Sequence, residues 1–415
     1  MLKVLSFLSI TNIKLSFLDQ VLISLSNFIF FFFVAKYTNI TVFTEISVIW
    51  IFILFFLVFE QSFITFPLKT AQNNFNNNYM EGLILFQIII LIVSFIISYL
   101  LIGFIFYYFL KIDFYQYNLL VSICVINQQI RLFVRRFLFK INKGSLQILF
   151  LIIEIFFIYS FLILALKQNI LNLENILLIL TLCSGIYFLY FITLVFKYNF
   201  SKNNFKNYLS NNNYFYKWHL PANILLYFSE YLIVLMSGYY ISKELIGNIR
   251  FFWIFIGPIT VFFQSFENFF PNYFSKSFIK NDNFNLRLFN FIIISLILIS
   301  LCTLFIYSIH DYIIVNYFDI DYLNNIIILK YLLFFCFIHF FKYILILIFR
   351  IFNLIKYLLY LEILKFLFII IFSKWFFLNY EEMGYIYLIY ICEFISVLFL
   401  ALLLFYYKKQ KLKNV

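Results

Sequence analysis

The sequence predicts an all-α integral membrane protein of about 12 transmembrane helices, arranged as two six-helix lobes. Three observations support this class. Of 415 residues, 65% are hydrophobic and only 12% are charged, with eight Gly and four Pro. Long apolar runs recur along the whole chain, and Lys and Arg fall in short clusters between them. A soluble domain with so few charges has no means of covering its surface, so most side chains must face lipid or other helices.

Each transmembrane helix needs about 20 mainly apolar residues to cross a hydrocarbon core of roughly 30 Å. The first apolar run has no small-residue cleavage site, so we expect it to remain in the protein as a helix rather than be removed as a signal peptide. The predicted spans are 16–35, 42–66, 83–110, 114–130, 146–166, 176–196, 220–241, 250–270, 288–309, 325–348, 358–372 and 385–407.

The positions of the basic residues predict the orientation. With a cytoplasmic N-terminus, 22 of the 30 Lys and Arg fall in cytoplasmic segments or at cytoplasmic helix ends. This is the bias that the positive-inside rule describes, and it persists to the basic C-terminal tail. The net charge of +12 is therefore a topology signal, and we expect no nucleic-acid partner. Both termini are predicted to be cytoplasmic.

A polar stretch divides the chain near its midpoint. We predict an N-terminal lobe at 1–198, a cytoplasmic connecting loop at 199–217 and a C-terminal lobe at 218–415. The halves share a short pattern, since Gln61 and Pro67 in the first correspond to Gln264 and Pro271 in the second. Six spans in each half give both the same orientation, which is the parallel kind of repeat found in secondary transporters.

Several local patterns resemble bacterial polysaccharide flippases. The first is the opening pair of helices, with Asp19, Gln20, Ser26, Asn27, Phe28, Ala35, Lys36, Glu60, Gln61 and Pro67. The second is a basic turn after the fourth span, with Arg131, Arg135, Arg136 and Lys140. The third lies around the eighth span, with Gly247, Arg250, Gly257, Pro258, Gln264 and Pro271.

The resemblance implies membership of the multidrug, oligosaccharidyl-lipid and polysaccharide exporter superfamily. It implies a flippase that moves a lipid-linked oligosaccharide, a polyprenyl-pyrophosphate repeat unit, to the outer leaflet of the bacterial cytoplasmic membrane by alternating access, for O-antigen or other surface polysaccharide biosynthesis. Such a protein is a transporter rather than an enzyme and needs no cofactor. Its expected partners are the substrate, membrane lipids, and the polysaccharide polymerase and chain-length regulator.

Polar and ionisable residues inside the predicted spans are the candidates for a transport site, because each is costly in lipid and should face the bundle interior. For the substrate cavity these are Asp19, Gln20, Glu60, Gln61, Arg250 and Gln264. For ion or proton coupling they are Glu154 and Glu230. We expect Asp19 and Glu60 to lie at a similar depth, where they either meet or act as solvated caps. Arg250 either binds an anionic group or only marks a helix entrance.

Other charged residues have simpler interpretations. Glu362 and Lys365 are three residues apart, so we expect them to neutralise each other. Glu393 lacks a partner in its own helix, and Lys365 is one candidate. Asp319 and Asp321 are best explained as a solvated outer loop.

Two alternatives to the flippase remain. An ion-coupled multidrug or organic-cation exporter would share the fold, and acids in mid-helix without basic partners favour it. A membrane polysaccharide polymerase or glycosyltransferase would need a large outer loop, whereas the predicted outer loops are short. The five Cys and three His lack metal-ligand spacing, and no P-loop is present, so we expect neither a metal site nor a built-in ATPase.

Overall fold

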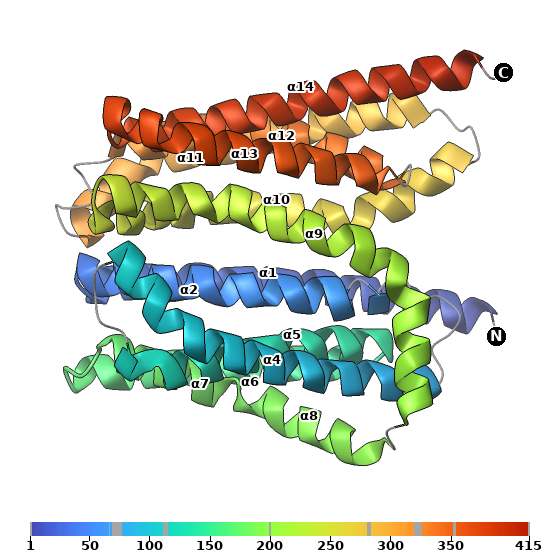
Figure 1. Ribbon diagram of the computed structural model, residues 1–415, viewed down its shortest axis with the longest axis horizontal. Helices are drawn as coiled ribbons and strands as arrows, with labels where there is room; N and C mark the ends of the chain where they lie inside the picture. Colours follow the sequence, from blue (N-terminus) through green and yellow to red (C-terminus); the bar gives the residue numbers. More distant parts are fainter. Residues whose placement is uncertain are drawn as a thin grey trace. The chain divides into compact units, whose positions relative to one another are not determined.

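The computed structural model describes residues 2–65, 67–68, 77–110, 115–198, 201–279, 284–318, 326–351 and 354–413. Within these ranges all regular structure is helical (Figure 1). The first unit of the chain contains most of α1 Leu2–Tyr37, then α2 Ile40–Glu60, the π-helical turn η1 Gln61–Thr65, α4 Asn77–Leu110, the short η2 Tyr115–Tyr117, α5 Asn118–Lys140, α6 Gly144–Lys167, α7 Leu173–Cys183 and α8 Gly185–Lys197. The remaining helices are α9 Lys202–Tyr240, α10 Lys243–Ile279, α11 Phe284–Tyr317, α12 Ile326–Ile351, α13 Ile355–Tyr380 and α14 Met383–Lys413.

Every predicted span falls on these helices, so the prediction of an all-α membrane protein is confirmed. The sixth predicted span corresponds to two helices, α7 and α8, which meet at a bend of 40°. By length and apolar composition alone, eight stretches among the described residues are able to cross a membrane, or nine if α7 and α8 form one broken span. Helix α5 is not among these stretches, because its polar side chains lower its mean hydropathy. Those side chains belong to the site described below.

The predicted end of the fourth span is wrong. The fourth span was expected to end at residue 130 and to be followed by a basic turn, but α5 continues to Lys140. Arg131 and Arg135 therefore lie on a helix, and the turn comes only at Asn142, which has the left-handed φ of 59°. Hydropathy placed the end of the fourth span too early, because the polar run 127–129 is typical of the membrane–water interface. In the structure these three residues are helical and buried.

The chain forms two compact units. The first comprises residues 1–30 and 37–227, and the second comprises residues 31–36 and 228–415. Both α1 and α9 contribute to both units, since the division at residue 227 falls inside α9. Most of the stretch expected as a connecting loop, 202–217, is the first part of α9. Helix α9 bends along its length (Figure 1), and it contains Pro221, which cannot complete the backbone hydrogen-bond ladder.

The first part of α9 packs on α4 within the first unit. Asn204 donates a hydrogen bond of 2.7 Å to Glu81, and the Tyr208 hydroxyl donates one of 2.9 Å to the Phe63 carbonyl. The two helices approach so closely that a Cβ on Gly82 would lie 2.6 Å from the Asn204 carbonyl oxygen. A glycine is therefore required at this crossing, because any side chain would push α9 away.

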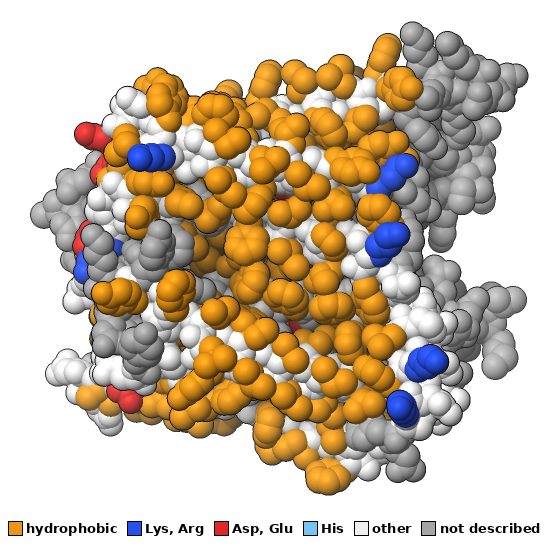
Figure 2. Space-filling view, viewed as in Figure 1, with side chains coloured by type: hydrophobic (Ala, Val, Ile, Leu, Met, Phe, Trp, Pro, Cys, Tyr) orange, Lys and Arg blue, Asp and Glu red, His pale blue; other side chains and the backbone are white. Residues whose placement is uncertain are grey.

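In the second unit α10, α12, α13 and α14 pack against one another. The Trp253 indole donates a hydrogen bond of 2.8 Å to the Tyr385 hydroxyl and joins α10 to α14. On the face shown in Figure 2, hydrophobic side chains cover the middle of the helices and charged side chains lie near their ends. Exposed residues of α4 and α11 include Leu100 and Leu304, at 66% and 64%. This is the surface expected of helices that face hydrocarbon.

Candidate functional site

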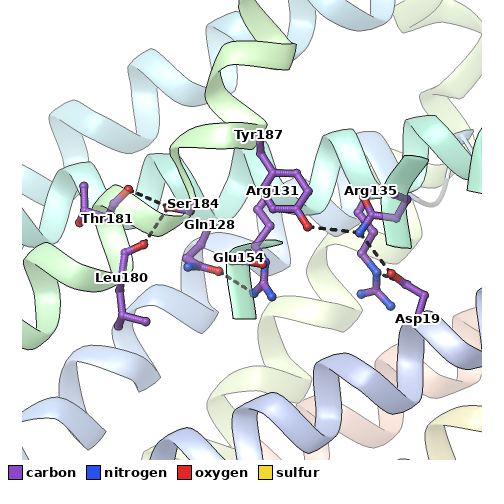
Figure 3. Close-up of polar contacts among 10 residues, drawn as sticks. Asp19, Gln128, Arg131, Arg135, Glu154, Leu180, Thr181, Ser184 and Tyr187 are labelled. Carbon is purple, nitrogen blue, oxygen red and sulfur yellow. Dashed lines mark hydrogen bonds and ion pairs between the residues drawn. The ribbon is translucent and has the colours of Figure 1, made fainter. Parts of the chain in front are cut away.

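Two arginines one turn apart on α5 form the centre of a buried polar network in the first unit (Figure 3). Arg131 Nε lies 2.9 Å from Oε2 of Glu154 on α6. Arg135 Nε lies 2.6 Å from Oδ2 of Asp19 on α1. Residues at i and i+4 share one face of a helix, so α5 directs both guanidinium groups to the same side, where α1 and α6 each supply a carboxylate.

Amide side chains complete the coordination of Asp19. Gln147 on α6 donates a hydrogen bond of 3.2 Å to Oδ1 of Asp19, while Arg135 uses Oδ2. Arg135 also donates from Nη2 to the side-chain oxygen of Gln20, at 2.8 Å. Gln147 in turn donates to the Tyr187 hydroxyl on α8 at 3.4 Å. These hydrogen bonds join α5 and α6 to α1, and they join α6 to α8.

The network is balanced in charge. Its two guanidinium groups face two carboxylates, and the side chains of Asp19 and Glu154 are each only 1% exposed. An isolated charge at such a position would cost several kcal/mol, and close pairing with hydrogen bonds is what offsets that cost. Arg131 has a further hydrogen bond of 3.2 Å to Gln128 on its own helix. The site is therefore a set of neutralised ion pairs with a polar surround.

Glu60 and Gln61 lie at a break in helix geometry. Glu60 is buried and accepts hydrogen bonds of 3.2 and 3.0 Å from the Thr65 hydroxyl, across the π-helical turn η1. Gln61 is exposed. Ser62 of the same turn accepts a hydrogen bond of 2.9 Å from Asn223 of α9. A π-turn widens the helix and frees backbone groups, and such turns are often associated with functional sites.

In the second unit Glu230 on α9 is exposed, although it lies within the apolar stretch Tyr216–Tyr240. It makes no ion pair with any residue that the structure describes, and its charge acts on Lys365, Tyr231 and Tyr385. Arg250 on α10 is partly buried, with its guanidinium carbon 5.7 Å from the centre of the Phe31 ring.

Arg250 acts on the same two tyrosines as Glu230, so the two charges share a polar neighbourhood around Tyr231 and Tyr385. The Gln264 side chain lies outside the described residues, as do Asp319 and Asp321.

A second buried charged cluster joins α12, α13 and α14. Lys342 lies 2.6 Å from Glu393, and Lys365 lies 3.0 Å from Glu362. The predicted neutralisation of Glu362 by Lys365 is confirmed. For Glu393 the sequence suggested Lys365, but the closest basic group is Lys342, with His339 at 3.4 Å. Lys342 lies within the predicted tenth span, 325–348, and its side chain is only 2% exposed.

The partners of Asp19 and Glu154 were not predicted. Both arginines had been assigned to a surface turn, so their carboxylate partners, 116 and 23 residues away in the chain, were not sought. The signal that would have found them is the spacing of Gln128, Arg131 and Arg135, which places polar groups on one face of a helix that continues past residue 130.

Comparison with known proteins gives similarity in fold. No protein-family model matches the chain, and no curated protein matches it. Among solved structures it is similar to one described as "Inward-facing conformation of a multidrug resistance MATE family transporter of the MOP superfamily". The alignment covers 94% of this chain and 96% of that one, with a TM-score of 0.69 and 10% sequence identity. The chain therefore has the helical fold of that transporter over nearly its whole length.

Proposed function

We propose that the chain is a secondary transporter that works by alternating access and exports an amphipathic organic cation. Its fold, shared with a protein described as a multidrug resistance transporter, supports the transport class. The observation that carries the choice of substrate is Glu230, an exposed carboxylate within a helical stretch otherwise apolar enough to span a membrane.

A carboxylate facing hydrocarbon costs about 2.5–3.5 kcal/mol or more, so an exposed Glu in a membrane span is expected to face a hydrated cavity. Glu230 makes no ion pair with a described residue, and its charge acts on the hydroxyl groups of Tyr231 and Tyr385. A hydrated carboxylate is suited to an organic cation, which gains from the opposite charge.

The buried basic residues also favour a cation over a phosphate. Arg131, Arg135, Lys342 and Lys365 are each within 3.0 Å of a carboxylate oxygen. A lipid pyrophosphate would have to compete with these carboxylates for each of them. Breaking a buried pair costs about 3–5 kcal/mol, so these four groups are poor anion sites.

The test is ethidium export from cells that lack their own multidrug exporters. Expression of the protein should lower steady-state ethidium fluorescence, and Glu230→Gln should abolish that effect at equal membrane abundance. Glu244→Gln, a change of a partly exposed Glu in the first turn of α10, serves as the matched carboxylate control. Ethidium retention equal to that of cells carrying empty vector would reject the organic-cation assignment.

The second candidate is a flippase for a lipid-linked oligosaccharide. It is supported by the sequence patterns that resemble polysaccharide flippases and by Arg250, whose buried Nε donates no hydrogen bond to a described residue. A guanidinium with spare donors is suited to a phosphate or an acidic sugar. Restoration of surface glycan in a strain that lacks its own flippase, without any ethidium export, would replace the first proposal by this one.

A further inference from the structure

The first part of α9 crosses the ends of the membrane-spanning helices of the first unit instead of running alongside them (Figure 1). It contacts α4 close to the start of that helix, where Asn204 donates to Glu81 and where Gly82 approaches the Asn204 backbone. Helix α8 ends at Lys197, shortly before α9 begins at Lys202. A helix that crosses the ends of membrane spans lies at the level of the lipid headgroups.

This part of α9 has two distinct faces. On one face Tyr208 is buried and donates a hydrogen bond of 2.9 Å to the Phe63 carbonyl, and the ring of Tyr216 lies 5.2 Å from that of Phe63 and 5.9 Å from that of Phe86. That face fixes the helix on the first unit. The other face is exposed and entirely polar, with Lys202, Asn203, Lys206, Asn207, Ser210, Asn211, Asn213 and Lys217.

Four exposed lysines follow this polar surface: Lys197 at the end of α8, and Lys202, Lys206 and Lys217 on α9. We call them the basic strip, and Lys and Arg side chains are visible at this end of the first unit in Figure 2. No Asp or Glu occurs in 175–229, and none of the four lysines makes an ion pair with a residue that the structure describes. Lys202 and Lys206 are one helical turn apart, a spacing at which like charges repel. An anion from outside the chain would relieve that repulsion.

Aromatic residues stand at both ends of the basic strip. The Lys197 ammonium lies 5.5 Å from the centre of the Tyr198 ring, and the Lys217 ammonium lies 5.4 Å from that of the Trp218 ring. Phe196, beside Lys197, is 86% exposed. Tyr and Trp are enriched where the hydrocarbon of a membrane meets water, because their rings are apolar on one side and polar at the tip. The aromatic residues therefore place the strip among lipid headgroups, which favours a lipid over a soluble anion.

We propose that the basic strip binds the headgroups of anionic phospholipids, with Lys202 and Lys206 contacting the headgroup phosphates. A cluster of about four to eight basic residues beside a membrane helix is typical of anionic-lipid binding. Each Lys carries a compact charge on a flexible stem, which suits phosphates that approach from several directions. A zwitterionic lipid such as phosphatidylcholine has its phosphate charge compensated and should bind weakly. This inference goes beyond the proposed transport activity and does not depend on the substrate.

The first experiment measures lipid binding by native mass spectrometry of the full chain in detergent, with phosphatidylglycerol or phosphatidylcholine added. Wild type should prefer phosphatidylglycerol. The double variant Lys202→Gln, Lys206→Gln should bind it at least tenfold more weakly, because each basic residue near an anionic surface contributes roughly fivefold. Lys202→Arg with Lys206→Arg keeps both charges and should retain the preference. Equal phosphatidylglycerol affinity for wild type and the double Gln variant overturns the proposal.

The matched control is the double variant Lys167→Gln, Lys374→Gln, which loses the same charge at two exposed lysines on α6 and α13. Its affinity for phosphatidylglycerol should equal that of wild type, and an equal loss in both double Gln variants would show an effect of net charge and reject the site. Glycerol phosphate tests a soluble ligand. It should not displace phosphatidylglycerol, and complete displacement at millimolar concentration would replace the lipid by a free phosphate ester.

The second experiment locates the bound lipid by amide hydrogen exchange in nanodiscs. Exchange over 202–213 should be slower in phosphatidylcholine containing phosphatidylglycerol than in phosphatidylcholine alone, and the double variant Lys202→Gln, Lys206→Gln should lose this difference. The turn between α6 and α7, at 168–172, serves as the control and should exchange equally in both. Exchange over 202–213 that does not respond to phosphatidylglycerol in the wild type overturns the assignment of the lipid to the basic strip.

Discussion

Asp19 and Arg135 are 116 residues apart in the chain, and their charged atoms lie 2.6 Å apart. The pair joins the first helix to the basic face of α5, and each member has a further polar partner, Gln147 for Asp19 and Gln20 for Arg135. A second hydrogen bond therefore fixes the side chain of each member of the pair.

This arrangement predicts a large asymmetry between single and double substitutions. Asp19→Asn leaves the buried Arg135 charge without a carboxylate and should destabilise the protein by about 3 kcal/mol, while the double variant Asp19→Asn, Arg135→Gln should recover a large part of the loss. Thermal unfolding in nanodiscs measures this. Asp311→Asn is the control, since Asp311 is 67% exposed and should have little effect. A double variant less stable than either single variant would contradict the pairing.

The two acidic residues of the second unit should differ in their importance for transport. Glu230→Gln removes an exposed carboxylate without an ion pair among the described residues, whereas Glu362→Gln changes a carboxylate that is 3.0 Å from Lys365. We expect Glu230→Gln to reduce export by at least tenfold at normal stability. The main effect of Glu362→Gln should instead be a lower melting temperature of the protein. Export assays normalised to membrane abundance separate the two, and equal export by both variants would remove Glu230 from the mechanism.

Arg250 separates the two substrate classes. If the protein carries a pyrophosphate-linked or acidic glycan, surface glycan should fall in the order wild type, Arg250→Lys, Arg250→Ala, because Lys keeps the charge but loses the planar fork. If it carries an organic cation, Arg250→Ala should leave export intact or raise it, since a nearby positive charge opposes the substrate. Membrane abundance is the control for both assays, and full glycan display by the Ala variant would exclude an anion-binding role.

The distribution of basic residues predicts the orientation in the membrane. Reporter fusions after Lys217 and Lys413 should show cytoplasmic activity, and a fusion after Asp321 should show activity on the opposite side. A non-cytoplasmic signal at Lys217 would be incompatible with an even number of spans before that point.

Two glycines offer a matched test of the packing of α9. A Cβ on Gly82 would lie 2.6 Å from the backbone of Asn204, whereas a Cβ on Gly185 meets nothing within 4 Å. Gly82→Ala should therefore lower the melting temperature by several degrees, because backbone cannot move aside as a side chain can. Gly185→Ala should leave it unchanged or raise it slightly, since Ala is favoured over Gly in a helix by about 0.5–1 kcal/mol.

Hydropathy placed a helix at every predicted span, because a span in lipid must be mainly apolar, but it did not separate α7 from α8 or predict the first part of α9. The boundary of α5 was missed for the converse reason: Gln128, Arg131 and Arg135 are polar yet buried, and a window average cannot distinguish a polar interior from a membrane surface. Pairing was predicted only where both members lie on one helix, as for Glu362 and Lys365. The partners of Glu154 and Glu393 come from other helices, and their identity depends on packing that a single sequence does not encode locally.

Helix α9 also determines where the polypeptide can be divided. A gene split at residue 200, in the polar stretch between the sequence halves, would leave the first fragment without Asn204, Tyr208 and Asn223, the groups that fasten α9 to the first unit. The second fragment would begin with a helix whose binding surface is on the other polypeptide. Separately made fragments should therefore be unstable alone. They should reassemble when co-expressed, because α9 of the second fragment binds the first fragment through these hydrogen bonds.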